Sequence, residues 1–377
     1  MMTHVFKTVP TIEIGAGCSK TLHDVCLRVG ISKPFIVSDP GVVKCGILKP
    51  AMASIEDYVL YQDVVADPPQ ATVEAAIEQA IRSQCDGVVG FGGGSSMDVA
   101  KLVAVAALGD QHLTDMYGVD MISGGRLPLI QIPTTAGTGS EATAVAIVTT
   151  GEHTKSGVVS YRLFADAILL DAELTVGLPP AVTAATGIDA MVHAIEAYTS
   201  KRLKNPISDM LALQALGLLS ANIKAAVING TDIVAREKML LGAMLAGQAF
   251  ANAPVGAVHA LAYPLGGIYH IPHGLSNSLV LPHVLRFNAE YAATMYDELA
   301  AVVFGSVEPN AGAYQLADYF YALAQELGLP VALRAMNIEE GGLSELAEQS
   351  MLQERLLINN PRTVALDEAL MIYQQAY

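Results

Sequence analysis

Short β-branched runs alternate with helix-like segments over the first half of the chain. These runs predict strands at 34–39, 58–63, 86–91 and 129–132. Helical patterns follow the second and third runs, at 71–84 and from a glycine-rich segment at 92–98 to about residue 108. Alternation of this kind predicts a parallel sheet that is covered by helices on both faces.

The pattern changes after residues 178–180. Strand patterns nearly vanish, and Ala/Leu-rich helical segments continue to the C-terminus, with apolar residues at helical spacing as in 317–327. The length of 377 residues suits two domains. We therefore predict an α/β domain over residues 1–178 and an all-α domain over residues 179–377.

Composition and charge narrow the class of protein. Apolar residues make up 52% of the chain and charged residues 15%, which favours a large buried core. The net charge of −16 repels phosphate backbones and anionic lipid, so we expect neither a nucleic-acid partner nor a membrane. The four cysteines form no Cys-x-x-Cys pair, and the N-terminus shows no secretory signal. A cytoplasmic protein is expected.

One long segment, residues 239–285, contains no Asp, Glu, Lys or Arg. Its length would allow a membrane span, but Gln248, Asn252, Pro254 and several histidines and glycines interrupt it. We interpret it as buried protein interior.

Two polar loops follow predicted strands. Gly92, Gly93, Gly94 and Ser95 lie between a buried strand and a helix, where backbone amides and the helix dipole can bind a phosphate. The next strand leads into a hydroxyl-rich loop that contains Thr134, Thr135, Thr138 and Ser140. Both loops lie at the carboxyl ends of strands, where open parallel sheets bind ligands. Their patterns are also typical of a serine-capped turn and an ordinary polar turn.

Asp39 ends an earlier strand. A carboxylate there suits a hydrogen bond to a ribose hydroxyl and would repel a 2′-phosphate, so it favours NAD over NADP. A strand-end aspartate is also an ordinary helix cap.

Histidines gather in the second half of the chain. Asp189 and His193 are four residues apart, which puts both on one face of a helix, and His259 and His273 lie in the uncharged segment. Three imidazoles and one carboxylate suit a divalent cation with a position left for a substrate oxygen. The alternative is a set of hydrogen-bonded core histidines. Glu196 and His283 are interpreted as supporting or structural residues.

Several long motifs occur in one order along nearly the whole chain: GGGSSMD, PTTAGTGSE, LPPAVTAATGIDAMVHAIEAY, HALAYPLGGIYHIPHGLSNSLVLPHVLRFN and NPRTVALDEAL. In these motifs the chain resembles the iron-containing (group III) alcohol dehydrogenase family. The resemblance implies a dehydroquinate synthase-like fold, with an α/β nucleotide-binding domain, a helical domain and a metal in the cleft between them.

The resemblance also implies residue roles. The implied metal ligands are Asp189, His193, His259 and His273. The implied nicotinamide-nucleotide residues are Asp39, Gly93, Gly94, Ser95, Thr134, Thr135, Thr143, Val145, Lys155 and Leu174. Without the resemblance, Lys155 would be interpreted as a surface lysine in a turn. Iron(II) is the implied metal, although the ligand set also suits zinc(II).

The chain departs from the family at one position. Many members have a histidine four residues after the third ligand, thought to relay the hydroxyl proton, and this chain has Tyr263 there. A phenol, with an ordinary pKa of about 10, is a weaker base at neutral pH. His270 is an alternative relay residue or a structural one. Tyr263 and His270 are therefore the candidates for proton transfer.

The predicted function is hydride transfer between NAD(H) and a small primary alcohol or its aldehyde, in a chain that the family leads us to expect as a homodimer. Alternatives on the same fold are a metal-free maleylacetate-type reductase and a dehydroquinate synthase-like cyclase that uses NAD only transiently. A further alternative is a protein that binds the nucleotide or metal without catalysis.

Overall fold

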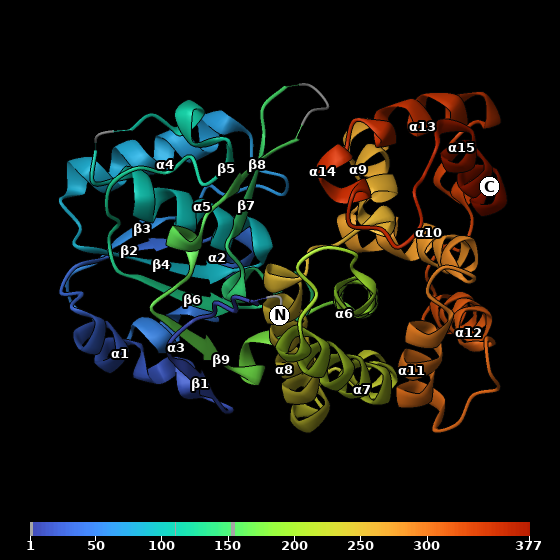
Figure 1. Cartoon of the computed structure of the whole chain (residues 1–377). Coiled ribbons are helices and arrows are strands. Elements are labelled where there is room, and N and C mark those ends of the chain that lie inside the picture. The colour runs from blue at the N-terminus through green and yellow to red at the C-terminus, as the bar shows by residue number, and fades with distance from the viewer. Residues whose placement is uncertain (1–2, 110, 152–154) are drawn as a thin grey trace. The chain divides into compact units, whose positions relative to one another are not determined.

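The computed structural model describes residues 3–109, 111–151 and 155–377, and it divides into two compact units (Figure 1). The N-terminal unit comprises Lys7–Gly177 and Thr231–Met244. The C-terminal unit comprises Leu178–Gly230 and Leu245–Tyr377 with the segment that ends at Phe6. Helix α8 (Ile233–Asn252) thus supplies residues to both units.

A six-stranded parallel sheet forms the centre of the N-terminal unit. The strands lie in the order β1 (Ile12–Ile14), β9 (Ala167–Leu170), β6 (Leu129–Pro133), β4 (Gly87–Gly92), β2 (Pro34–Val37) and β3 (Val59–Tyr61). Every neighbouring pair is parallel. β4 is buried at each of its residues, as expected for a central strand with both faces covered. The predicted parallel sheet is confirmed.

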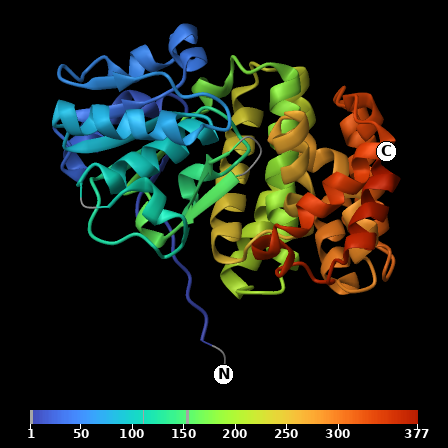
Figure 2. The same ribbon diagram turned by 90° about the horizontal axis from the view of Figure 1, so that it is seen from above.

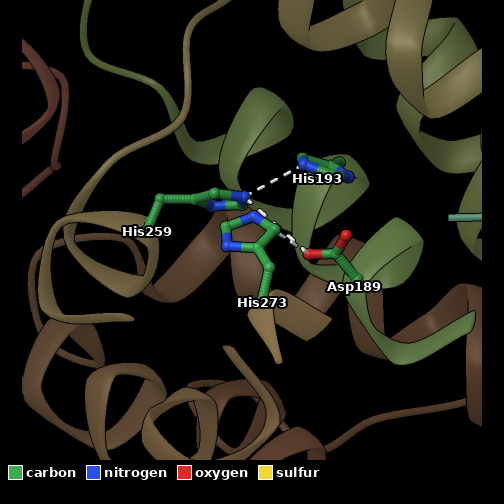
Figure 3. Close-up of side chains that lie close together, drawn as sticks. All are labelled: Asp189, His193, His259 and His273. Atoms are coloured by element: carbon green, nitrogen blue, oxygen red, sulfur yellow. Dashed lines mark hydrogen bonds and ion pairs between the residues drawn. The ribbon is translucent and has the colours of Figure 1, made fainter. Parts of the chain in front are cut away.

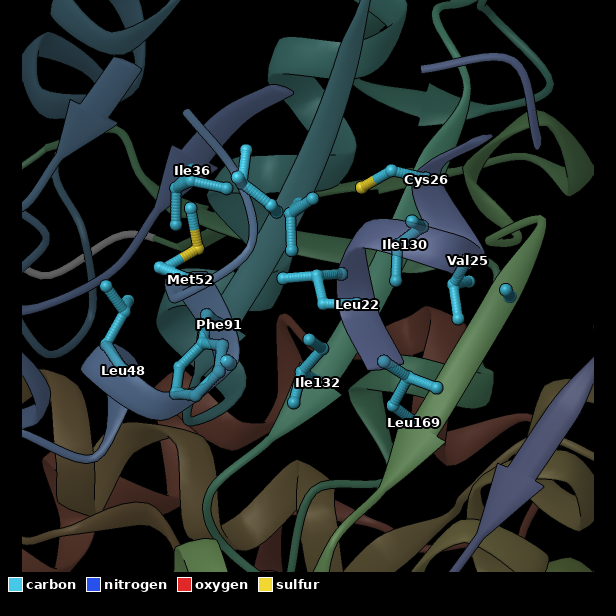
Figure 4. Close-up of a cluster of buried hydrophobic side chains, with 14 of the residues drawn as sticks. Leu22, Val25, Cys26, Ile36, Leu48, Met52, Phe91, Ile130, Ile132 and Leu169 are labelled. Atoms are coloured by element: carbon cyan, nitrogen blue, oxygen red, sulfur yellow. The ribbon is translucent and has the colours of Figure 1, made fainter. Parts of the chain in front are cut away.

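Helices cover both faces of this sheet. On one face α1 (Leu22–Val29) and α3 (Leu48–Met52) pack against it, with Leu22 among the buried side chains that meet Phe91 and Ile132 (Figure 4). On the other face lies α5 (Gly94–Ala106). A Cβ on Gly90 would meet the side chain of Ala100 at 2.9 Å, so a glycine lets α5 approach β4 closely.

Other elements of the N-terminal unit include α2 (Pro40–Cys45) and α4 (Gln70–Ser83). The helices predicted at 71–84 and 92–108 are therefore found as α4 and α5. A second sheet was not expected from the sequence. It has the order β5 (Gly118–Val119), β8 (Lys155–Val159) and β7 (Val145–Thr149), with β7 and β8 antiparallel.

The described residues of the C-terminal unit form helices and no strand. They are α6 (Pro180–Thr199), α7 (Pro206–Ile228), α9 (Ala257–Tyr269), α10 (His273–Asn288), α11 (Ala293–Phe304), α12 (Gly312–Glu326), α13 (Leu343–Met351), α14 (Glu354–Leu357) and α15 (Leu366–Ala376). α10 packs against α6, α9 and α12 (Figure 2). The predicted helical second half is confirmed.

The uncharged segment 239–285 spans most of α8, all of α9 and most of α10, and most of its apolar side chains are buried. Within the described ranges, α7 is long and apolar enough to cross a membrane by length and composition, with a mean hydropathy of 1.6. α8 and α9 pass the same test only as a pair bent by 107°. A core helix of a soluble protein meets these criteria as well.

Candidate functional site

Helix α6 carries two of the four predicted ligands. Pro179 and Pro180 begin the helix, and an Ala/Ile-rich sequence continues it through the protein interior. Asp189 and His193 lie one turn apart on the same face, and their side chains are 1% and 4% exposed. Such burial requires partners for both polar groups.

The other two predicted ligands lie in the first turns of α9 and α10. His259 lies in the first turn of α9, and His273 is the first residue of α10. Between the two helices His270 adopts a left-handed conformation, with φ 55°, and Pro272 precedes α10. This break lets two consecutive helices place their N-terminal turns at one point.

The structure brings all four side chains together (Figure 3). One atom from each lies within 4.8 Å of the corresponding atoms of the others. Nε2 of His259 is 3.0 Å from Nε2 of His193 and 3.9 Å from Oδ1 of Asp189, and Nε2 of His273 is 3.7 Å from the same oxygen. A tetrahedral cation with ligands at about 2.1 Å would separate them by roughly 3.4 Å. The spacing therefore fits a metal ion.

The hydrogen bonds around His259 fix its tautomer. Nδ1 of His259 is 2.6 Å from Oε2 of Glu196, whose Oε1 accepts the backbone N–H of Val258 at 2.7 Å. A carboxylate only accepts, so Nδ1 carries the proton and Nε2 presents a lone pair toward the cluster. Carboxylate support of this kind orients metal-binding histidines in proteins. The interpretation of Glu196 as a supporting residue agrees with this contact.

Asn277 is a member of the site that sequence reasoning missed. It lies one turn after His273 on α10 and is fully buried, and its Nδ2 donates to Oδ1 of Asp189 at 2.6 Å. Asn277 lies four residues after His273, so the sequence places both on one face of a helix. The sequence does not show that this face meets Asp189, because that contact depends on the packing of α6 against α10. Burial alone would raise the pKa of Asp189, but the three histidines and this amide lower it below its ordinary value.

The two candidates for proton relay lie in different surroundings. Tyr263 is half-buried on α9, one turn after His259, and its ring centroid is 5.9 Å from that of His273. His270 is exposed, and within the described part of the chain its ring makes no hydrogen bond. The geometry thus places Tyr263 beside the cluster.

The predicted phosphate loop joins β4 to α5, with Gly93 as the N-cap. A Cβ on Gly94 would meet Cγ2 of Thr138 at 2.8 Å, whereas one on Gly93 would meet nothing nearer than Thr135, at 3.7 Å. Gly94 is therefore required by the close approach of the next loop. Gly93 leaves open space of the kind a ligand could use.

Two neighbouring cofactor candidates, Asp39 and Thr134, form hydrogen bonds at this edge of the sheet. Asp39 caps α2 by accepting the N–H of Val42 at 3.0 Å, and its other oxygen lies 3.4 Å from Oγ of Ser96. The N–H of Thr134 donates to the carbonyl of Gly92 at 3.0 Å. The carboxyl ends of β2, β4 and β6 therefore gather these residues. Ser95 lies in the first turn of α5, and Leu174 is buried in a short turn after β9.

Thr143 and Val145 are held by a buried lysine that sequence reasoning did not single out. Nζ of Lys101 donates to Oγ1 of Thr143 at 3.0 Å, to the carbonyl of Val145 at 2.7 Å and to Oγ of Ser140 at 2.7 Å. The hydroxyl of Thr143 is thus engaged inside the protein.

Lys155 begins β8 and pairs with Asp67, with 2.5 Å between Nζ and Oδ1. Its side chain is only 13% exposed. Lys155 therefore lies in a strand and in an ion pair rather than in a turn, whereas a role toward the cofactor stays a prediction.

Comparisons with known proteins decide the family. The model of the iron-containing alcohol dehydrogenases matches residues 10–172, and the model of the C-terminal domain of the Fe-containing alcohol dehydrogenase family matches residues 183–377. The chain belongs to the iron-containing alcohol dehydrogenase family. The family named from the motifs is thereby confirmed, as are the fold class and the assignment of the chain as an oxidoreductase.

Individual relatives match over their full length. Long-chain-alcohol dehydrogenase 1 of Geobacillus thermodenitrificans is 38% identical over 98% of this chain and 95% of its own. Among solved structures, a 1,3-propanediol oxidoreductase has a TM-score of 0.95 at 31% identity, covering 100% of both chains. The sulfoacetaldehyde reductase of Bifidobacterium kashiwanohense, solved with NAD⁺, has a TM-score of 0.90 at 29% identity, covering 100% of this chain and 99% of its own. Relatives of this iron-containing family thus act on chemically different alcohols and aldehydes.

Proposed function

We propose that this protein interconverts a small primary alcohol and its aldehyde with NAD(H), using a divalent cation held by four residues. These ligands are Asp189, His193, His259 and His273. The observation that carries the proposal is their convergence: acceptor atoms on three helices, three of them buried and that of His273 partly exposed, face one another at the spacing of a metal site. Buried acceptors in that arrangement need a donor or a cation.

The bound cation and nicotinamide would supply a Lewis acid that makes the hydroxyl more acidic and a hydride acceptor. The protein's own residues do the rest. Glu196 holds His259 in the tautomer that presents Nε2 inward. Tyr263, beside His273, can hold a proton at its phenol oxygen. The weak basicity of a phenol makes it a relay rather than the final base.

The nucleotide is proposed to bind at the carboxyl ends of β2, β4 and β6. Backbone amides of the Gly93–Ser95 turn would donate hydrogen bonds to the phosphates of the nucleotide, since a helix N-terminus after a glycine turn favours anions. Asp39 at the neighbouring strand end would accept a hydrogen bond from a ribose hydroxyl and would repel a 2′-phosphate, which supports NAD over NADP. The NAD⁺ complex of the related sulfoacetaldehyde reductase supports the same choice.

Metal identity, location and assembly are part of this proposal. Iron(II) is proposed from the family, although the nitrogen- and oxygen-containing set would hold zinc(II) at least as tightly. The four cysteines are unpaired, which suits a reducing cytoplasm. We propose a homodimer, which light scattering on a size-exclusion column tests directly.

An anaerobic activity screen tests the function. Metal-stripped protein receives Fe(II) or Zn(II), NAD(H) or NADP(H), and a panel of short alcohols and aldehydes. We expect turnover that returns with metal and falls by at least about 1,000-fold in His259→Ala, because one ligand is lost. His23→Ala, which removes a histidine from α1 in the other unit, is the matched control and should keep wild-type turnover.

Other results would identify a rival function. Equal turnover without metal would indicate a metal-free reductase. NAD that is reduced only transiently, with no net NADH, would indicate a cyclase. Cofactor binding without any turnover would overturn the dehydrogenase proposal and leave the fold unaffected.

A further inference from the structure

Asn277 contacts three of the four proposed ligands. Its Nδ2 lies 2.6 Å from Oδ1 of Asp189 and 3.3 Å from Nε2 of both His259 and His273. The side chain is fully buried, on the turn of α10 that follows His273. One amide group thus lies at the point where the ligand atoms converge.

The chemistry of the partners fixes the orientation of this amide. A carboxylate oxygen only accepts, so the nitrogen of Asn277 must face Asp189. Its Oδ1 has no hydrogen-bond partner among the residues that the structure describes. A buried amide with an unused oxygen destabilises a core relative to an apolar side chain of the same shape. The interactions that compensate for this cost are therefore the ones its nitrogen makes with the ligands.

We infer that Asn277 is a positioning residue of the metal centre. Its amide holds Oδ1 of Asp189, the oxygen nearest the histidine nitrogens, in the direction of the cation. It also donates to the bare nitrogens of His259 and His273 while no cation is bound. The inference rests on the proposed metal site.

The two hydrogens of the Asn277 amide make different hydrogen bonds. The 2.6 Å contact with Asp189 takes one hydrogen, and the two 3.3 Å contacts share the other. A bound cation would occupy the lone pairs of the two histidine nitrogens, which could then no longer accept a hydrogen bond from Asn277. The hydrogen bond from Asn277 to Asp189 would remain. Removal of the donor should therefore change how the metal is held as well as how stable the metal-free protein is.

Cobalt(II) is the probe, because its visible absorption reports the number and geometry of its ligands. Metal-stripped wild type is compared with Asn277→Leu, which keeps the branched shape but has no donor, and with Asn277→Ser, a small polar replacement in case the leucine variant fails to fold. Ser276→Ala is the matched control. It removes the neighbouring buried hydroxyl on α10, which bonds the carbonyl of Ile271 at 3.3 Å and no ligand. Competition with a chelator gives each affinity.

We expect both Asn277 variants to bind cobalt(II) about 10- to 100-fold more weakly, with a shifted absorption band, while Ser276→Ala matches wild type in both measurements. Wild-type affinity and spectrum in either folded Asn277 variant would overturn the inference. Failure of wild type itself to bind cobalt(II) would instead reject the metal site of the proposed function. The two failures are therefore distinguishable.

Discussion

Asp39 performs two tasks that a single substitution can separate. It caps α2 through Val42, and it is proposed to repel a 2′-phosphate. Asparagine caps helices as well as aspartate does but carries no charge. In Asp39→Asn we expect the ratio of kcat/KM for NADP to that for NAD to rise about tenfold or more, equivalent to about 1.4 kcal/mol. The measurement is initial rates with each cofactor.

Asp39→Ala provides the comparison. It removes charge and cap together, so its cofactor ratio should rise similarly while its free energy of unfolding falls by about 1 kcal/mol. Denaturation with urea measures the second effect. If Asp39→Asn leaves the cofactor ratio at the wild-type value, the carboxylate serves as a cap alone.

Individual site residues differ in how far the sequence could reveal them. Asp189 and His193 could be predicted as a pair because residues four apart lie on the same face of a helix. Asn277 and Lys101 could not, because a lone asparagine or lysine gives no local signal of its partners. Asn277 acquires its role from the packing of α6 against α10, which no local pattern encodes.

Among the elements, α5 and β7 are joined by a buried charge. Lys101 on α5 is fully buried and donates to the carbonyl of Val145, while Asp98 accepts the N–H of Ile147 at 3.0 Å. Burial lowers the pKa of Lys101, and Asp98 opposes that shift. We expect Lys101→Met to lower the free energy of unfolding by about 3 kcal/mol, because Asp98, whose side chain is only 16% exposed, loses its cation. Hydrogen exchange at Ile147 should accelerate.

Lys20→Met is the control for this prediction. It breaks an ion pair with Glu173 in which both side chains are about half exposed, so stability and exchange should stay at the wild-type level. Urea denaturation and exchange at β7 are measured on both variants. Unchanged protection of β7 in Lys101→Met would show that the contacts of Lys101 do not hold β7 in place.

At the same scale, most strands of the large sheet could be predicted from local pattern, whereas those of the small sheet could not. β2 and β4 appear in the sequence as continuous apolar runs, and β6 as an apolar run interrupted only by Gln131. β7 alternates half-buried with buried residues, and its partner β8 has one buried residue and contains a lysine and a glycine, so local pattern does not separate β8 from a loop. Their pairing depends on tertiary contacts such as those of Lys101.

In the whole molecule, the two proposed sites belong to different compact units. All four proposed metal ligands lie in the C-terminal unit, whereas all the proposed nucleotide residues lie in the N-terminal unit. A ligand stabilises the structure that it binds, by about 2.7 kcal/mol when its concentration is 100 times its Kd. Each ligand should therefore leave its own pattern of protection.

Hydrogen exchange resolved by segment tests this expectation on wild-type protein. Zinc(II) alone should slow exchange in α6, α9 and the first turn of α10, and should leave β4 and the start of α5 unchanged. NAD alone, added to metal-free protein, should slow exchange at the ends of β2, β4 and β6. His273→Ala should lose the zinc effect and keep the NAD effect, because it removes a ligand from one unit only. Equal protection of both units by zinc alone would contradict the assignment of the four metal ligands to the C-terminal unit, since a ligand stabilises the structure that it binds.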